Sequence, residues 1–565
     1  MKDSETSYPA DPQKKLRVGL LVDSLIQPRW IQKVIEDIQR SSIAEIVLVV
    51  QNAAQQSAKP SRMQSYWRNR RHLLFAAYAR FDDFKTKAEP DAFATTTVEA
   101  LLKECELIQV EPVSTKFTDR FRDEDLRRIR EYDLDVALRF GFRILKGDVL
   151  KIARHGVWSY HHGDNYVNRG GPAGFWEVME GEPVTGAMLQ ILNDELDNGQ
   201  VLSRSWSPTS DRFSVKINRN NYYWKSSALV MRKLRELHKQ GSVSLEKNST
   251  FHPYYNRLYK LPTNSEMMGI LAKLGARYVA SKTEHLSFFE QWSLAYRFRS
   301  GPNDANNAFY KFKFLIPPRD RFWADPFPVK VGDRYFVFIE EFIYEAGKGH
   351  ISVFEIDRNG ITQSPIEALV RDYHLSYPFV FQWQDEFYMI PETAANNAVE
   401  LYRCTSFPSK WEFEKVLLND VNASDATLLE KDGLWWMFVN IGELKYPSDW
   451  DELHIFYADN PKGEWRAHAR NPVKSDVRGS RPAGRVFEWH GELYRPAQDS
   501  SKRYGYAISV NRILRLTADD FAEEEVTKIL PLWHKNVLAT HTLNSADDIT
   551  VIDCLMKRTR FKSLN

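Results

Sequence analysis

Two segments of the chain carry residue types that could do chemistry. The first contains SYHHGD, where His161 and His162 stand close to Asp164, and it continues to LDNG with Asp197. An imidazole can accept a proton and a carboxylate can orient it, so a His/Asp pair suits acid–base catalysis. A structural role is open for either histidine, and LDNG is also typical of a turn. His161, His162 and Asp164 leave a metal site open as an alternative, although we predict none.

The second segment carries polar residues at corresponding points of a repeat. Asp325 lies in ADP, Glu392 in IPET and Asp425 in SDA, while Arg481 and Arg495 lie in a later copy. Acids and arginines around one channel, in a chain that is 13% aromatic, suit a charged or sugar-like ligand. A pair of carboxyl groups could also hydrolyse a glycosidic bond. The alternative is a structural role, in which these acids cap turns or bond neighbouring units.

The N-terminal elements that must position the first segment alternate between strand and helix patterns. LRVGLLVD (16–23) and AEIVLVVQN (44–52) are typical of buried strands, and WIQKVIEDIQRS (30–41) has helical spacing of apolar residues. This order predicts a βαβ unit with a parallel sheet. Since ligands bind beyond the ends of such strands, we predict an α/β domain over 16–205 with its site there. Residues 1–15 are predicted to be a disordered tail.

The pattern changes in the second half of the chain. Helical segments at 224–240 and 264–282 predict a helical extension and linker over 206–300. From 301 the chain shows short aromatic strands in repeated strand–turn–strand units, with starts about 50–60 residues apart. Such a period predicts an all-β five-bladed β-propeller over 301–565, and an irregular β-sandwich is the alternative. The units lie at 327–341, 379–393, 426–440, 483–498 and, more weakly, 545–553.

Composition excludes several classes of protein. Of the 565 residues, 43% are hydrophobic and 27% charged, as in ordinary soluble proteins, so a disordered or fibrous chain is excluded. The net charge of +2 indicates no nucleic-acid partner. Three widely spaced cysteines predict neither a disulfide framework nor a cysteine zinc site. We find no secretory signal and no apolar run long enough for a membrane span, and therefore expect a cytoplasmic protein. The sequence indicates no oligomeric state.

Residues 140–199 resemble the N10-formyltetrahydrofolate-dependent formyltransferases, a family that includes methionyl-tRNA and amino-sugar formyltransferases. The resemblance rests on five motifs in the family's order and spacing. These are FGFRIL (140–145), GVWSYH (156–161), RGGP (169–172), Gly181 followed by Thr185-Gly186, and LDNG (196–199). The resemblance implies an α/β Rossmann-like formyltransferase domain with N10-formyltetrahydrofolate as co-substrate.

The same resemblance implies roles for particular residues. His161 and Asp197 take the family's catalytic His and Asp positions, and Ser159 stands where the family has a catalytic Asn. A serine hydroxyl can donate a hydrogen bond to the formyl oxygen but is shorter than an amide, so altered or lost chemistry is an alternative. The predicted cofactor-binding residues are Phe140, Gly141, Phe142, Ile144 and Leu145.

Residues 320–525 resemble the N-terminal, non-catalytic part of plant glucosamine inositolphosphorylceramide transferases. The shared phrases include FWADPF (322–327), YMIPET (388–393), SDATLL (424–429) and SRPAGRVF (480–487). The region is also distantly similar to five-bladed glycoside-hydrolase propellers, which place acids at the inner starts of blades. Both resemblances imply a carbohydrate context, so the ligand residues predicted here are Asp325, Glu392, Asp425, Arg481 and Arg495.

Together the two halves predict a formyltransferase that acts on an amine of an amino sugar or glycan precursor, with the propeller binding the acceptor. A formyltetrahydrofolate hydrolase is one alternative. Another is a glycan-binding or assembly protein whose formyltransferase-like domain is inactive, and a third is a propeller that is itself the enzyme. The small-molecule partners expected are folate and an amine-bearing sugar, with no nucleic acid.

Overall fold

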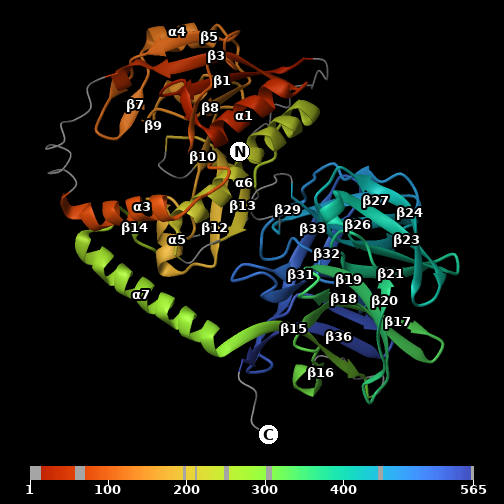
Figure 1. Ribbon diagram of the computed structural model, residues 1–565. Helices are drawn as coiled ribbons and strands as arrows, with labels where there is room; N and C mark the ends of the chain where they lie inside the picture. The colour runs from red at the N-terminus through yellow and green to blue at the C-terminus, as the bar shows by residue number, and fades with distance from the viewer. Residues whose placement is uncertain are drawn as a thin grey trace. The chain divides into compact units, whose positions relative to one another are not determined.

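The computed structural model describes residues 14–56, 70–194, 199–209, 213–246, 254–300, 308–442 and 450–560. Two compact units divide the chain, Met1–Gly275 and Ala276–Asn565, which run from red to yellow-green and from green to blue in Figure 1. Within the described ranges, no helix combines the length and the apolar character that crossing a membrane requires.

The N-terminal unit is built on a seven-stranded sheet in the order β13-β12-β10-β8-β1-β3-β5. The five strands from β10 to β5 pair in parallel, whereas β12 and β13 run antiparallel at one edge. β1 is central and buried along most of its length, which explains its unbroken apolar sequence. The bounds are β1 Leu16–Val22, β3 Ala44–Asn52, β5 Glu106–Val110, β8 Val136–Arg139, β10 Val157–His161, β12 Val184–Ile191 and β13 Gln200–Pro208.

Two helices of this unit, α1 (Arg29–Arg40) and α6 (Val215–Gln240), form where their sequences predict. α1 buries an apolar stripe that includes Val34 and Ile38, and its order between β1 and β3 confirms the predicted βαβ unit. In α6 the Ser214 hydroxyl accepts a hydrogen bond from the first turn, and Gly241 ends the helix in the left-handed conformation. Among the described residues, the unit also holds α3 Leu73–Lys85, α4 Asp123–Arg130 and α5 Phe175–Glu180, and α7 (Asn264–Ser287) begins in it and ends beyond the division at Gly275.

The division between the units falls earlier than the predicted start of the all-β domain at 301. α6 packs against α1 and β12, so most of the predicted linker belongs to the α/β unit. β15 (Phe288–Phe298) pairs with β36 (Ile549–Thr559) over its whole length, which makes it part of the all-β unit. Local periodicity could not assign β15, because its partner strand lies at the other end of the unit.

In its described residues the C-terminal unit holds five antiparallel sheets (Figure 1). Four follow the chain in order, and the fifth joins β15 and β16 to the C-terminal strands. The first sheet comprises β17 Arg321–Val331, β18 Arg334–Ile343, β19 Lys348–Ile356 and β20 Ile361–Leu369, and the second β21 Ser376–Trp383, β22 Glu386–Glu392, β23 Ala398–Ser406 and β24 Lys410–Asn419. The third comprises β25 Ala423–Lys431, β26 Leu434–Ile441, β27 Glu452–Ala458, β28 Arg466–Ala467 and β29 Lys474–Ser475, and the fourth β30 Phe487–Trp489, β31 Glu492–Asp499, β32 Ala507–Leu516 and β33 Phe521–Ile529. The fifth adds β16 Lys313–Leu315, β34 Val537–Ala539 and β35 Leu543–Ala546 to β15 and β36.

Each predicted strand–turn–strand unit is a pair of adjacent strands. The pairs are β17/β18, β21/β22, β25/β26, β30/β31 and β35/β36, which confirms the repeat as a structural one. Large apolar side chains from different sheets share one core. That core includes Phe327, Phe338, Phe379, Tyr388 and Trp435.

Candidate functional site

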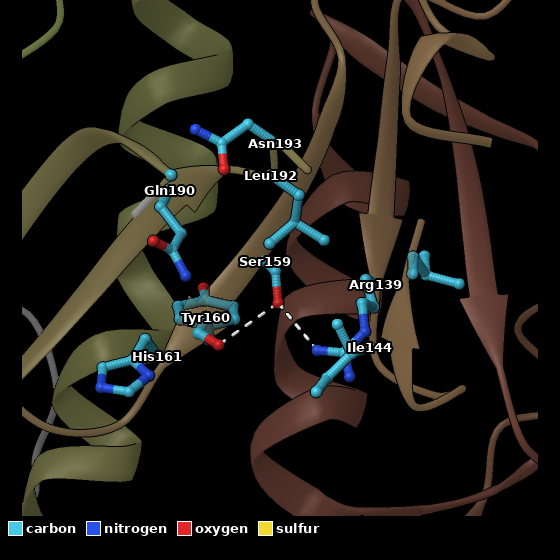
Figure 2. A pocket seen from close by; sticks show the side chains of 10 residues that line it. Arg139, Ile144, Ser159, Tyr160, His161, Gln190, Leu192 and Asn193 are labelled. Carbon is cyan, nitrogen blue, oxygen red and sulfur yellow. Dashed lines mark hydrogen bonds between the residues drawn. The ribbon is translucent and has the colours of Figure 1, made fainter. Parts of the chain in front are cut away.

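The N-terminal unit contains a small cavity of about 100 Å³ at the ends of β8, β10 and β12 (Figure 2). Arg139, Ser159 and Gln190 are aligned across these three strands, because Arg139 pairs with Ser159 and Ser159 pairs with Gln190. Residues in register on neighbouring strands project from the same face, so the sheet brings these polar groups together. The lining residues are Arg139, Ile144, Leu145, Ser159, Tyr160, His161, Gln190, Leu192, Asn193 and Gly199.

Arg139 organises one side of this cavity. Its Nη1 donates to Ser159 Oγ at 3.2 Å, and its Nη2 donates to the carbonyls of Phe142 and Arg143 at 3.0 and 2.9 Å. Burial lowers the pKa of the guanidinium, and the charges of Asp23 and Asp119 oppose this shift. The guanidinium therefore holds the loop after β8 and presents a desolvated positive charge beside Ser159.

The structure brings some of the predicted residues of this site together and separates others. Ser159, His161, Ile144 and Leu145 line the cavity, whereas Phe140, Gly141 and Phe142 do not. Asp197 lies outside the described residues. Arg139 and Gln190 were not predicted, since only strand register, and no local motif, places them beside Ser159.

Phe142 and Gly141, which do not line the cavity, make packing contacts in the loop after β8. Phe142 is buried against Phe121 with ring centroids 5.0 Å apart. Gly141 lies against the backbone of Asp23, where a Cβ would come within 2.3 Å of the Asp23 nitrogen. These contacts give both residues a packing role in the loop after β8.

The alternative of a metal bound by His161, His162 and Asp164 is not supported. His162 stacks on Tyr223 with ring centroids 3.6 Å apart, and burial holds its pKa well below the ordinary value. Asp164 accepts a hydrogen bond from Trp206 Nε1 at 2.9 Å. The two side chains therefore have separate partners and do not converge on one ligand position.

In the all-β unit, a repeated backbone feature places the predicted polar residues. Asp325, Tyr377 and Asp425 have positive φ angles of 51°, 43° and 59°. Each lies at a register shift in the first strand of its sheet. Bulges re-aim side chains, and strained positions that recur in this way indicate a functional constraint.

Arg481 joins two of these acids. Its Nε donates to Asp425 Oδ2 at 2.5 Å, and its Nη2 donates to Glu392 Oε2 at 3.0 Å and to Asp425 Oδ1 at 3.2 Å. Gln498 Nε2 also donates to Asp425 Oδ2, at 2.8 Å. The ring of Tyr504 lies 5.3 Å from the guanidinium. The predicted residues Glu392, Asp425 and Arg481 therefore form one ion-pair network.

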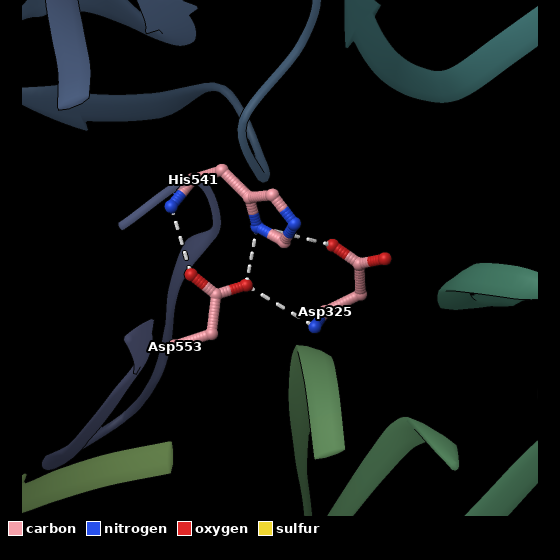
Figure 3. A group of neighbouring side chains, drawn as sticks. All are labelled: Asp325, His541 and Asp553. Atoms are coloured by element: carbon pink, nitrogen blue, oxygen red, sulfur yellow. Dashed lines mark hydrogen bonds and ion pairs between the residues drawn. The ribbon is translucent and has the colours of Figure 1, made fainter. Parts of the chain in front are cut away.

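Asp325 belongs to the adjoining group, which His541 and Asp553 complete (Figure 3). His541 Nδ1 lies 2.5 Å from Asp553 Oδ2 and 3.7 Å from Asp325 Oδ1. Thr542 Oγ1 donates to Asp325 Oδ1 at 2.6 Å. Among the described residues, this trio is the one group of His, Cys, Asp or Glu side chains close enough to share a metal ion. Glu340 pairs with Ala324, the neighbour of Asp325, across β17 and β18. We define the inner polar cluster as Asp325, Glu340, Glu392, Asp425, Arg481, Gln498, His541 and Asp553.

The electrostatics of the inner polar cluster favour positive charge. Burial and the neighbouring charges of Asp425 and Asp553 raise the pKa of Asp325 to about 6, although His541 opposes them. Burial, together with nearby carboxylates, raises the pKa of Glu340 well above its usual range. It does the same to Glu392, against the opposing charge of Arg481. The acids outnumber the cations, so a cationic or hydroxyl-rich ligand suits the cluster.

Arg495 is the predicted ligand residue that lies outside this cluster. Its guanidinium is buried and donates to Glu523 at 2.7 and 2.8 Å and to the carbonyl of Gly479 at 2.6 Å. Burial raises the pKa of Glu523, but Arg495 and Lys474 outweigh it and bring the value to about 2. Arg495 therefore belongs to a structural ion pair within the fourth sheet.

The sequence analysis missed His541 and Asp553. They come from the loop before β35 and from β36, a repeat unit that is weak in the sequence. Neither has a local motif, and their partner Asp325 lies more than 200 residues away, as the contact between Thr542 and Asp325 shows with a separation of 217 residues.

Residues 317–546 match the family model described as Glucosamine inositolphosphorylceramide transferase 1, N-terminal. The chain is 39% identical over 208 residues to glucosamine inositolphosphorylceramide transferase 1 of Oryza sativa subsp. japonica and 35% identical over 212 residues to that of Arabidopsis thaliana. Each match covers 36% of this chain and 28% or 27% of the relative. The chain thus spans just over a quarter of the length of these relatives.

Similarity to formyltransferases is weaker and shorter. Methionyl-tRNA formyltransferase of Bacteroides fragilis is 28% identical over 100 residues, which cover 18% of this chain and 31% of that protein. Among solved structures, glycinamide ribonucleotide transformylase 1 of Symbiobacterium toebii (12% identity, TM-score 0.28) covers 41% of this chain and 92% of its own. A family 117 glycoside hydrolase of Zobellia galactanivorans (14% identity, TM-score 0.30) covers 47% and 90%. These scores are too low to support a functional argument.

The comparisons correct the predicted function. The prediction of formyl transfer from N10-formyltetrahydrofolate to an amine is wrong, because the stronger relatives are glucosamine inositolphosphorylceramide transferases. The geometry agrees with this correction, since the Ser159 hydroxyl donates to the carbonyl of Tyr160 and accepts from Arg139. The comparisons give no support to folate as a partner, and the co-substrate stays a prediction.

Proposed function

We propose that residues 276–565 form the sugar-recognising part of a glycosyl transferase and bind a glucosamine unit at the inner polar cluster. The observation that carries this proposal is that the inner polar cluster lies almost wholly within the segment similar to glucosamine inositolphosphorylceramide transferases. This segment, 317–546, contains every member of the cluster except Asp553. The cluster also has the charge that an amino sugar requires, because an ammonium group is attracted to an excess of buried carboxyl groups.

Glu392 is the acid best placed to meet a ligand. Its side chain is 13% exposed, whereas that of its neighbour Asp425 is only 2% exposed. Its pKa is raised by burial in the free protein. A sugar ammonium beside it would favour the carboxylate and release a proton, so binding should strengthen as the pH rises while the amine stays charged.

Calorimetric titration of the full chain with D-glucosamine and with D-glucose tests the proposal, since the two sugars differ in the amine. We expect glucosamine to bind and glucose to bind at least about tenfold more weakly, which corresponds to one lost charged hydrogen bond. Glu392→Gln should remove this preference. Glu386→Gln is the matched control, because Glu386 lies on the same strand with an exposed side chain.

Two outcomes contradict the proposal. Equal affinity for the two sugars would show that the carboxyl groups do not recognise the amine. Retention of the preference in Glu392→Gln would place the binding site elsewhere. Titration in buffers of different ionisation enthalpy measures the protons released on binding. Glucosamine should release a proton from the unaltered chain and none from Glu392→Gln, a difference that altered packing in the variant would not produce.

We also propose that the five sheets are blades of a closed five-bladed β-propeller around this cluster. Support comes from hydrogen bonds that link four of the five pairs of neighbouring sheets. Tyr377 N donates to Asp325 between the first and second sheets, and Tyr377 OH bonds Thr427 of the third. Arg481, in the segment before the fourth sheet, donates to Asp425 of the third, and Thr542, directly before β35 of the fifth, donates to Asp325 of the first. The β15–β36 pairing would then fasten the two ends of the ring.

A further inference from the structure

We propose that the N-terminal unit binds a small molecule through an oxyanion, a carboxylate or a phosphate, in the cavity lined by Arg139, Ser159 and Gln190. This site is independent of the sugar site proposed for the all-β unit. It is carried by three observations on the described residues: a half-buried guanidinium with no carboxylate partner, a buried amide with an unpaired oxygen, and the cavity between them (Figure 2).

The first observation is the charge of Arg139. In the part of the chain that the structure describes, no carboxylate lies within 4.0 Å of its guanidinium, and its hydrogen bonds go to Ser159 Oγ and to two backbone carbonyls. The nearest charges, Asp23 and Asp119, have other partners: Asp23 accepts from Phe142 N at 2.8 Å, and Asp119 pairs with Arg143 at 2.7 Å. A charge that is partly withdrawn from water gains from an opposite charge beside it, so this half-buried, desolvated guanidinium at a cavity favours an anionic ligand.

The geometry of the guanidinium leaves a donor for this ligand. Arginine has five N–H groups. Nε and the two N–H groups of Nη2 face the carbonyls of Phe142 and Arg143, and one N–H of Nη1 faces Ser159. The second N–H of Nη1 is therefore available on the side of Ser159, where the cavity lies.

The second observation is Gln190. Its side chain is buried, and its Oε1 has no hydrogen-bond partner among the described residues. Gly199 permits this position, because a Cβ there would come within 2.8 Å of that oxygen. The amide can present its NH₂ to a carboxylate or phosphate oxygen, or its oxygen to a protonated phosphate. Either orientation gives a second contact opposite Arg139.

The strand register fixes the positions of these three side chains relative to one another. Arg139, Ser159 and Gln190 occupy one row across β8, β10 and β12, so their spacing is fixed by backbone hydrogen bonds. Ile144, Leu145 and Leu192 line the rest of the cavity. The ligand class is therefore a small acid or phosphate ester with an apolar part beside its anionic group.

NMR titration of the full chain with acetate and with inorganic phosphate tests the proposal, with ligand signals of carbon and phosphorus followed at constant ionic strength. We expect saturable binding of one of the two probes, which tells a carboxylate ligand from a phosphate. Arg139→Gln should weaken that binding at least about tenfold, as expected for the loss of a charge-assisted hydrogen bond. Arg127→Gln removes the same charge from an exposed position on α4 and should leave binding unchanged.

Two further variants keep the test decisive if Arg139→Gln does not fold. Arg139→Lys retains the charge and should retain weakened binding. Ser159→Ala should weaken binding without loss of charge, because the Ser159 hydroxyl holds the Arg139 guanidinium in position. Absence of saturable binding of both probes at tens of millimolar would overturn the proposal. So would binding that is the same in Arg139→Gln, Ser159→Ala and the unaltered chain.

Discussion

Replacing Arg481 by methionine should destabilise the all-β unit through the two carboxylates left behind. Arg481 makes three contacts of 2.5–3.2 Å with Asp425 and Glu392, and the three side chains are only 8%, 2% and 13% exposed. Removing one partner of a buried ion pair costs about 3–5 kcal/mol, because an uncompensated charge remains. Glu392 keeps some contact with water, so we expect the lower end, about 3 kcal/mol at pH 8.

The loss should depend on pH. Burial raises the pKa of Glu392, and Arg481 opposes this shift, so removing the guanidinium should raise the folded-state pKa of Glu392 further and make its protonation favour the folded state. The stability of Arg481→Met should therefore be highest in acid and fall as the pH rises from about 4 through the raised pKa of Glu392. Arg481→Met combined with Glu392→Gln should recover part of the loss, since one stranded carboxylate is then neutral.

Urea denaturation at pH 5 and pH 8, followed by tryptophan fluorescence, measures this effect. The transition of the N-terminal unit provides an internal reference, because all named partners of Arg481 lie in the all-β unit. Arg512→Met is the control, since Arg512 pairs with Glu492 and Glu524 on an exposed surface. If Arg481→Met matched this control at both pH values, the cluster would not hold the buried charges described.

Three other changes probe the same unit. Burial lowers the pKa of His541, but the charges of Asp553 and Asp325 outweigh burial and raise it above the ordinary value. Stability from the His541–Asp553 pair is therefore complete below about pH 6.5 and lost as the pH rises through the raised pKa, and His541→Gln should flatten that dependence in urea titrations. Gly505→Ala should cost about 2–3 kcal/mol, because φ is +61° and the new Cβ would also lie 2.7 Å from His541. Gly433→Ala, with φ +75° and no atom within 4 Å, should cost about 1 kcal/mol, and equal melting losses would refute the contact. Removing residues 549–565 deletes β36 and should abolish cooperative unfolding of the all-β unit in calorimetry, and an intact transition would argue against closure by β15 and β36.

The strands and helices were largely predictable because their signals are local. The predicted strand 16–23, helix 30–41 and strand 44–52 correspond to β1, α1 and β3 within a residue or so at each end. The repeated strand pairs were equally visible, since side chains alternate with a period of two and turns punctuate them. Asp325, Glu392, Asp425 and Arg481 could be selected from sequence for the same reason, as polar residues at recurring points of a repeat.

Only the tertiary structure decided which of these residues meet. Arg495 has the same sequence context as the other predicted ligands, but it pairs with Glu523 inside one sheet, whereas Arg481 reaches two other sheets. His541 joins Asp325 from the far end of the unit. Such contacts depend on strand register and on the packing of sheets, which set distances between residues hundreds of positions apart.

The site in the N-terminal unit shows the same division. The SYHHGD segment indicated His161, the resemblance to formyltransferases indicated Ser159, and both residues line the cavity. Arg139 and Gln190 could not be inferred, because they face Ser159 only through the pairing of three strands. The sequence by itself determined the local elements and the polar positions of this protein. The register and packing of the sheets decided which side chains became partners, because the free energy of a buried charge depends on neighbours that sequence distance does not specify.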